Sequence, residues 1–97
     1  MQQIAKQLKD LQNVGKATLK DLEVLGIDTI ELLAEQDPTF LFQELERRTQ
    51  KQHDPCVWDV FAAIIHEAKT GTPTKWWEWT VKRKALDSPL HAEGNSD

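Results

Sequence analysis

The feature that most constrains the fold is a short break, Asn13-Val14-Gly15, between two patterns of apolar residues at helical spacing. The pattern before the break predicts a helix over about residues 3–11, and the pattern after it predicts a helix over about residues 16–25 that stops at Gly26. Two short helices joined by so few residues are expected to run antiparallel. The chain is therefore expected to begin with a helical hairpin over about residues 3–26.

The glycine in this break supports two interpretations. In the first, the amides that follow Gly15 are the unpaired donors of a helix N-terminus, where an anion can bind, and nearby lysines add positive charge. In the second, Gly15 only lets another backbone approach closely, and the lysines are solvated. The candidate phosphate-binding site of the first interpretation comprises Asn13, Val14, Gly15, Lys16, Ala17, Thr18 and Lys20.

A second hairpin is expected over about residues 28–49. Asp28 or Thr29 can cap its first helix, and Asp37-Pro38 is typical of a cap followed by the first helical residue. The turn of this hairpin lacks the glycine and lysine of the first, so we expect a structural copy without the phosphate-facing chemistry. The next helix, over about residues 54–69, is apolar nearly all round and is therefore expected to be the central helix.

Three tryptophans, Trp76, Trp77 and Trp79, lie within the last expected helix, over about residues 73–85. In one interpretation, most of these indoles close the core over the central helix. In the other, they form a stacking platform for bases or a surface for a protein partner, assisted by the basic residues that follow. Residues 87–97 carry little to bury and are expected to be a disordered tail.

Length and composition bound the class of protein. A chain of 97 residues forms one small domain, expected over residues 1–86. No apolar run is long enough to cross a membrane, and no leader segment is evident. The single cysteine, Cys56, has no partner for a disulfide within the chain, so a reducing cytoplasm is the expected location.

The net charge of −4 argues against a strong nonspecific nucleic-acid binder, but the charge is segregated along the chain. Residues 1–20 carry four lysines and one aspartate, whereas residues 21–46 carry eight acidic residues and no basic one. Such patterning permits a local basic face on an acidic protein, although charge runs are commonly solvated helix surface. The secondary basic contacts of such a face are expected at Arg47, Arg48, Lys82, Arg83 and Lys84.

The sequence offers no catalytic or metal-binding constellation. His53, Asp54 and Cys56 are close in sequence, but a zinc site needs three or four ligands held together, and His66 is the only other nearby candidate. Capping by Asp54 and burial of Cys56 account for these residues. There is no phosphate-loop signature and no nucleophile elbow, so we expect neither an enzyme nor a cofactor.

The stretch NVGKATLKDLEVLGI resembles the hairpin of helix-hairpin-helix DNA-binding proteins, although a common form of that motif has glycine where this chain has Asn13. Over about residues 8–84, the segments LGI, LLAEQDP, DPCVWDVF and WWEW resemble a small bacterial family of pathogenicity-locus, or mitomycin-resistance, proteins. The resemblance implies an all-α fold with tandem helix-hairpin-helix pairs of the SAM-like type. The mitomycin-resistance label implies a link to DNA damage.

These observations lead to two functional hypotheses. The first is a noncatalytic helix-hairpin-helix module that binds the DNA phosphate backbone weakly and without sequence specificity. The second is a protein-interaction module in which the hairpins are scaffold and the Trp-rich segment or the acidic surface of residues 21–46 meets a partner. The position of the basic clusters distinguishes them, because one shared face favours nucleic acid and dispersal favours protein.

Overall fold

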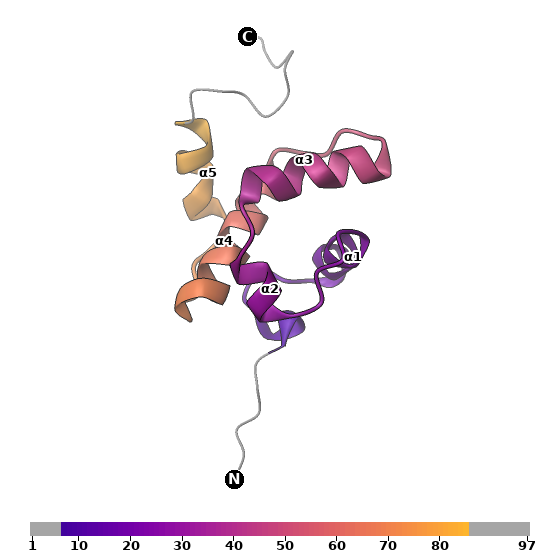
Figure 1. The fold of residues 1–97 in the computed structure, drawn as a ribbon. Helices are drawn as coiled ribbons and strands as arrows, with labels where there is room; N and C mark the ends of the chain where they lie inside the picture. Colours follow the sequence, from indigo (N-terminus) through magenta and orange to yellow (C-terminus); the bar gives the residue numbers. More distant parts are fainter. Residues whose placement is uncertain (1–6, 86–97) are drawn as a thin grey trace.

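The computed structural model describes residues 7–85, which form five α-helices and one 3₁₀ turn, with no strand among them (Figure 1). The elements are η1 (Leu8–Asp10), α1 (Lys16–Val24), α2 (Ile30–Ala34), α3 (Pro38–Thr49), α4 (Cys56–Thr70) and α5 (Trp77–Lys84). The expected all-α class is confirmed over this part of the chain. The expected C-terminal tail, residues 87–97, lies outside the described residues.

Helix α4 is the centre of the fold, as its apolar sequence predicts. It contacts α2, α3 and α5, which lie around it in Figure 1. Phe61 and Ile64 on α4 are fully buried, and they pack in one cluster with Leu33 of α2 and Phe42 of α3. Helix α4 ends at Gly71, whose φ of 80° is left-handed and whose N–H donates to the carbonyl of Glu67 at 2.7 Å.

Side-chain caps set the starts of α2 and α3. Thr29 Oγ1 accepts from the Leu32 amide at 3.0 Å, so Thr29 is the cap of α2. The Asp37 carboxylate caps α3 with Pro38 at the first turn, as predicted. The cap that the sequence predicts at Asp54 is displaced: the cap residue of α4 is Pro55, and Asp54, two residues before α4 begins, accepts from the Cys56 amide at 2.8 Å through Oδ1.

The helix expected over residues 3–11 differs from what the structure shows. Among the described residues it is present only as the three-residue turn η1, and residues 1–6 lie outside them. The Gln7 backbone is extended, and its amide is bonded to the Asp10 carboxylate at 2.9 Å. Leu11 is again extended, so the helix cannot continue, and the buried side chains of Leu8 and Leu11 anchor the turn to the core.

The indoles are divided between the two interpretations offered by the sequence. Trp79 packs against the core cluster and Trp76 is half-buried, whereas Trp77 is 54% exposed. Helix α5 itself has no fully buried residue. None of the helices in residues 7–85 has the length and apolar character needed to cross a membrane.

Candidate nucleic-acid interface

The turn before α1 combines a left-handed residue with an extended glycine. Asn13 has a φ of 77°, and the Val14 amide donates to the Leu11 carbonyl at 3.3 Å. Gly15 then has a φ of −111° and a ψ of −170°, the extended conformation of a residue that precedes a helix. The carbonyl of Gly15 accepts the first α1 hydrogen bond, from Leu19, at 2.9 Å. The expected helix start is therefore confirmed.

Close packing does not require glycine at position 15. A Cβ atom built on Gly15 would meet no heavy atom within 4 Å, and the φ angle is one that any residue adopts. The close-approach part of the second interpretation is therefore wrong, whereas its other part, solvated lysines, agrees with the exposed side chains of Lys16 and Lys20.

The N-terminus of α1 has no side-chain cap. Gly15 supplies no cap oxygen, the first turn has no acidic residue, and within residues 7–85 no acceptor bonds to the amides of Lys16, Ala17 or Thr18. The side chains of Lys16 and Lys20 are exposed and Thr18 is half-buried. This end of α1 thus presents free N–H groups and the positive end of the helix dipole, beside the exposed ammonium groups of Lys16 and Lys20.

Two residues of the predicted site serve the fold. Asn13 Nδ2 donates to the Thr74 carbonyl at 2.6 Å, and Asn13 Oδ1 accepts from the Trp76 amide at 3.3 Å. The side chain therefore joins the turn before α1 to the segment before α5. Val14 is half-buried and packs against the core. The same turn is held by Glu67, whose Oε1 accepts from the Gln12 amide at 2.9 Å.

The first pair of secondary basic residues is engaged by acidic and carbonyl groups. Arg47 and Arg48 both bond to Glu44, the latter at 2.9 Å, and hydrogen bonds from Arg47 and Arg48 lower the pKa of Glu44 to about 2. Arg48 also donates to the Val24 carbonyl at 3.0 Å. Because Val24 ends α1 and Lys16 begins it, Arg48 lies about 12 Å along the helix axis from the uncapped amides.

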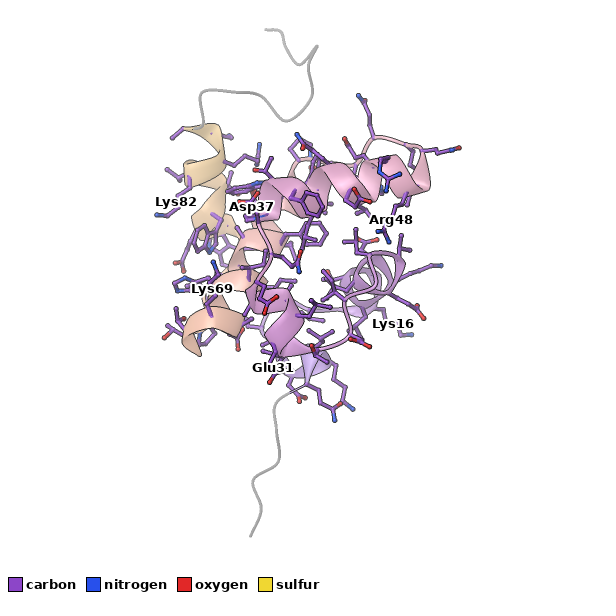
Figure 2. All side chains as sticks on the ribbon, in the orientation of Figure 1. Lys16, Glu31, Asp37, Arg48, Lys69 and Lys82 are labelled. Carbon is purple, nitrogen blue, oxygen red and sulfur yellow. The ribbon has the colours of Figure 1, made fainter. Side chains whose placement is uncertain are left out.

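The second basic cluster lies on the other side of the molecule. Figure 2 places Lys82 on α5, with α4 between it and Lys16, whereas Arg48 is on the side of Lys16. Arg83 turns inward, where its guanidinium bonds at 2.8 Å to Asp59, a fully buried carboxylate that also accepts from Thr80. The three basic clusters therefore do not share one face. By the criterion stated for the sequence, this dispersal favours a protein partner over an extended nucleic-acid surface, and it leaves the start of α1 as the one place in the predicted site where a phosphate contact is still supported.

The residues considered as metal ligands have other partners. His53 contacts the Thr49 hydroxyl at 2.8 Å through Nε2. Burial and the hydrogen bond to Asp54 raise the pKa of the Cys56 thiol. The hydrogen bond from the Cys56 amide lowers the pKa of Asp54. No three His, Cys, Asp or Glu residues in the described part of the chain are grouped so that they could hold a metal ion.

Sequence reasoning missed the polar contacts that position α5. Asp59 lies 24 residues from Arg83, and Asn13 lies 61 residues from Thr74. An aspartate inside an otherwise apolar helix was the one available signal for the first pair. No local pattern points to the second.

The geometry of residues 7–85 defines a small all-α domain that is built around one apolar helix and has an uncapped start of α1 with exposed Lys16 and Lys20 beside it. The chain belongs to the Cdd1 family, described as a pathogenicity locus, whose family model matches residues 1–85. It is similar to the mitomycin resistance protein McrB of Streptomyces lavendulae, with 33% identity over 89 residues that cover 91% of this chain and 81% of that relative. No solved structure matches the chain significantly. The resemblance drawn from the sequence motifs is confirmed.

Proposed function

We propose that this protein is a noncatalytic module that binds the phosphate backbone of DNA through the N-terminus of α1, used as a helix-hairpin-helix element. The observation that carries the proposal is the uncapped start of α1, with exposed Gly15 and Lys16. The sequence resemblance to helix-hairpin-helix DNA-binding proteins supports it.

In this proposal, the free amides of Lys16 and Ala17 donate hydrogen bonds to one phosphate, as helix N-termini commonly do for anions. The Thr18 hydroxyl contributes a further donor, and Lys16 and Lys20 add charge. These groups all meet the sugar–phosphate backbone, so they position the protein without reading base sequence.

Few charges take part, and this limits the affinity. If Lys16 and Lys20 neutralise two phosphates, log K should fall with log salt at a slope of about −2 on duplex DNA. The surrounding chain is acidic, with a net charge of −4, which weakens binding further at low salt. The expected dissociation constant is micromolar or weaker, in line with nonspecific DNA binding.

The relative's name supports a cellular context. Mitomycin resistance is a property of the relative, and we propose that the present chain likewise acts in the response to DNA damage. A module that grips backbone without reading sequence suits damaged or branched DNA, whose sequence is arbitrary.

The test is a salt-series titration of labelled duplex, single-stranded and junction DNA by fluorescence anisotropy, with Lys16→Glu as the critical variant. Lys69→Glu is the matched control, because it makes the same charge change on an exposed lysine on the far side of the molecule (Figure 2). Duplex or junction binding that falls at least tenfold in Lys16→Glu and much less in Lys69→Glu supports the proposal. Binding that is absent at low salt, or equal in the two variants, refutes it.

The protein-interaction hypothesis is examined with the same preparation. It requires that the molecular mass of the protein rises with protein concentration, or changes when a partner is added. Lys16→Glu should not affect either change. A strict monomer across the titration range, with DNA binding that depends on Lys16, favours the DNA-binding module over self-association.

A further inference from the structure

Helix α5 presents an exposed face that its packing onto α4 does not use. Trp77, Val81 and Lys84 follow one another at helical spacing, so they lie along one side of α5. Trp77 is 54% exposed to solvent. Val81 is 72% exposed, the highest value for a large hydrophobic residue within residues 7–85. The residues that hold α5 to the core, Trp79 and Arg83, point elsewhere.

The exposed indole of Trp77 is held in place by its neighbours. Its ring packs edge-on against Trp76, with ring centroids 5.6 Å apart, and the Lys75 ammonium lies 5.5 Å from its centroid. The Trp76 amide is in turn bonded to Asn13 at 3.3 Å. A ring positioned in this way loses little side-chain freedom when a planar ligand stacks on it.

The charge around this indole is positive. Lys75, Lys82 and Lys84 are exposed, and the Lys82 ammonium lies 5.3 Å from the centroid of Trp79. The one acidic residue of α5, Glu78, faces back to the Lys75 amide at 3.4 Å. The Trp77 face of α5 therefore combines an aromatic surface with two cations, Lys75 and Lys84, whereas Lys82 lies on the Trp79 side of the helix.

We propose that this face binds single-stranded nucleic acid, with one base stacked on Trp77 and the backbone phosphates near Lys75 and Lys84. Stacking on an aromatic ring beside a basic track is the way in which proteins bind single strands without sequence preference. Duplex DNA does not supply the ligand, because its base faces are already stacked on one another. Charge complementarity favours this anionic ligand over an apolar protein partner, which would leave Lys75 and Lys84 unmatched.

This site is separate from the one in the proposed function. It lies on α5 and the residue before it, and shares no residue with the α1 N-terminus, although Asn13 joins the two segments. Variants at the two places therefore distinguish failure of one proposal from failure of the other.

The experiment titrates the full chain into fluorescein-labelled (dT)10 and (rU)10 at low salt, with anisotropy as the readout and quenching of intrinsic tryptophan fluorescence as the second. Trp77→Leu keeps apolar bulk but removes the stacking ring, whereas Trp77→Phe keeps a smaller ring. We expect Trp77→Leu to weaken binding between about fivefold and about 150-fold, the range for loss of one stacked base, and Trp77→Phe to weaken it less. Equal affinity for the two oligonucleotides means that the 2′-hydroxyl is not read, and a preference identifies the natural polymer.

The charge contribution is measured in the same assay. Lys75→Ala and Lys84→Ala should each reduce the slope of log K against log salt by about 0.7, the value for one phosphate on a single strand. Lys82→Ala is the matched control on the Trp79 side of α5 and should reduce the slope less. Lys16→Glu, the variant that tests α1, should weaken (dT)10 binding less than Trp77→Leu does, and its remaining effect should vanish as added salt screens the charge.

Phe40→Leu is the matched aromatic control, because Phe40 is 55% exposed but lies on α3 without a neighbouring lysine in sequence. Circular dichroism and the melting temperature confirm that the variants fold. Unchanged affinity in Trp77→Leu overturns the proposal, as does equal loss in Phe40→Leu. A concentration-dependent mass that Trp77→Leu abolishes, without oligonucleotide binding, also overturns it and assigns the face to a protein contact.

Discussion

Replacement of Gly15 by aspartate tests the reasoning about the start of α1 directly. Gly15 already has the extended backbone of a cap residue, like Thr29 and Asp37, and space is open around the position of its Cβ atom. An aspartate there should place a carboxylate oxygen on the amide of Ala17 or Thr18, which has no acceptor in the structure. The variant supplies from within the chain the anion that we propose α1 takes from DNA.

The expected gain in stability is small but measurable. Aspartate is favoured over glycine at a helix cap by a few tenths of a kcal/mol, and a negative charge at the first turn adds about 0.3–1 kcal/mol. Together, Gly15→Asp should raise the free energy of unfolding by about 0.5–1 kcal/mol. For a domain of this size, that corresponds to a rise of about 2–8 °C in melting temperature.

DNA binding should change in the opposite direction. The carboxylate occupies the amides and repels phosphate, and hydrogen bonds to a charged group contribute about 1.5–3 kcal/mol, so binding should weaken about tenfold or more. Gly15→Asn is the control, because it caps the helix with the same shape but no charge. It should raise the melting temperature by less than Gly15→Asp and should weaken binding less.

The measurements are thermal unfolding followed by circular dichroism and anisotropy with a DNA duplex. If neither Gly15→Asp nor Gly15→Asn stabilises the protein, the α1 amides are not free and the reading of this helix start is refuted. If both variants stabilise it but DNA affinity is unchanged, the fold reasoning holds and the assignment of the phosphate site to α1 fails.

Two further predictions concern contacts outside α1. Arg83→Ala leaves the fully buried Asp59 without its guanidinium partner and should lower the free energy of unfolding by about 3–5 kcal/mol, nearer the lower figure because water can reach the position that Arg83 vacates. Urea unfolding measures this loss. The control is Lys84→Ala, an exposed neighbour, which should change the free energy of unfolding by less than about 0.5 kcal/mol. Asp54 has a folded-state pKa below its unfolded value of about 3.9, so its stabilising contribution is complete above that pH and is lost as the pH falls through the folded pKa. The stability difference between the parent and Asp54→Ala should therefore be largest at neutral pH and shrink below about pH 4. A difference that grows on acidification would contradict the assignment of the Cys56 amide as the partner.

Local chemistry made the middle of the chain predictable. Asp37-Pro38 and Gly71 bound α3 and α4 because a cap oxygen, a proline at the first turn and a left-handed glycine act on neighbouring residues. The apolar surface all round α4 likewise determines its central place, since every face must be covered by another element.

Contacts between distant residues were beyond local patterns. The sequence groups Arg83 with its basic neighbours, but in the fold it neutralises Asp59, so only two of the three cations in that cluster face solvent. Similarly, Arg48 forms an ion pair with Glu44 and donates a hydrogen bond to the Val24 carbonyl at the end of α1. A charge run therefore overstates the basic surface, because pairing depends on which helices pack together and not on spacing along the chain.

Asn13 shows how a departure from a motif can preserve its geometry. A common form of the helix-hairpin-helix turn has glycine at this place, and the φ of 77° here is one that glycine or asparagine adopts with little strain. Asparagine meets the same backbone requirement and adds two hydrogen bonds, to the Thr74 carbonyl and from the Trp76 amide. The backbone that presents the α1 amides is thereby tied to the segment that positions the exposed indole. A glycine at position 13 would keep the turn but release that segment, so the side chain of Asn13 serves α5 while its backbone serves α1.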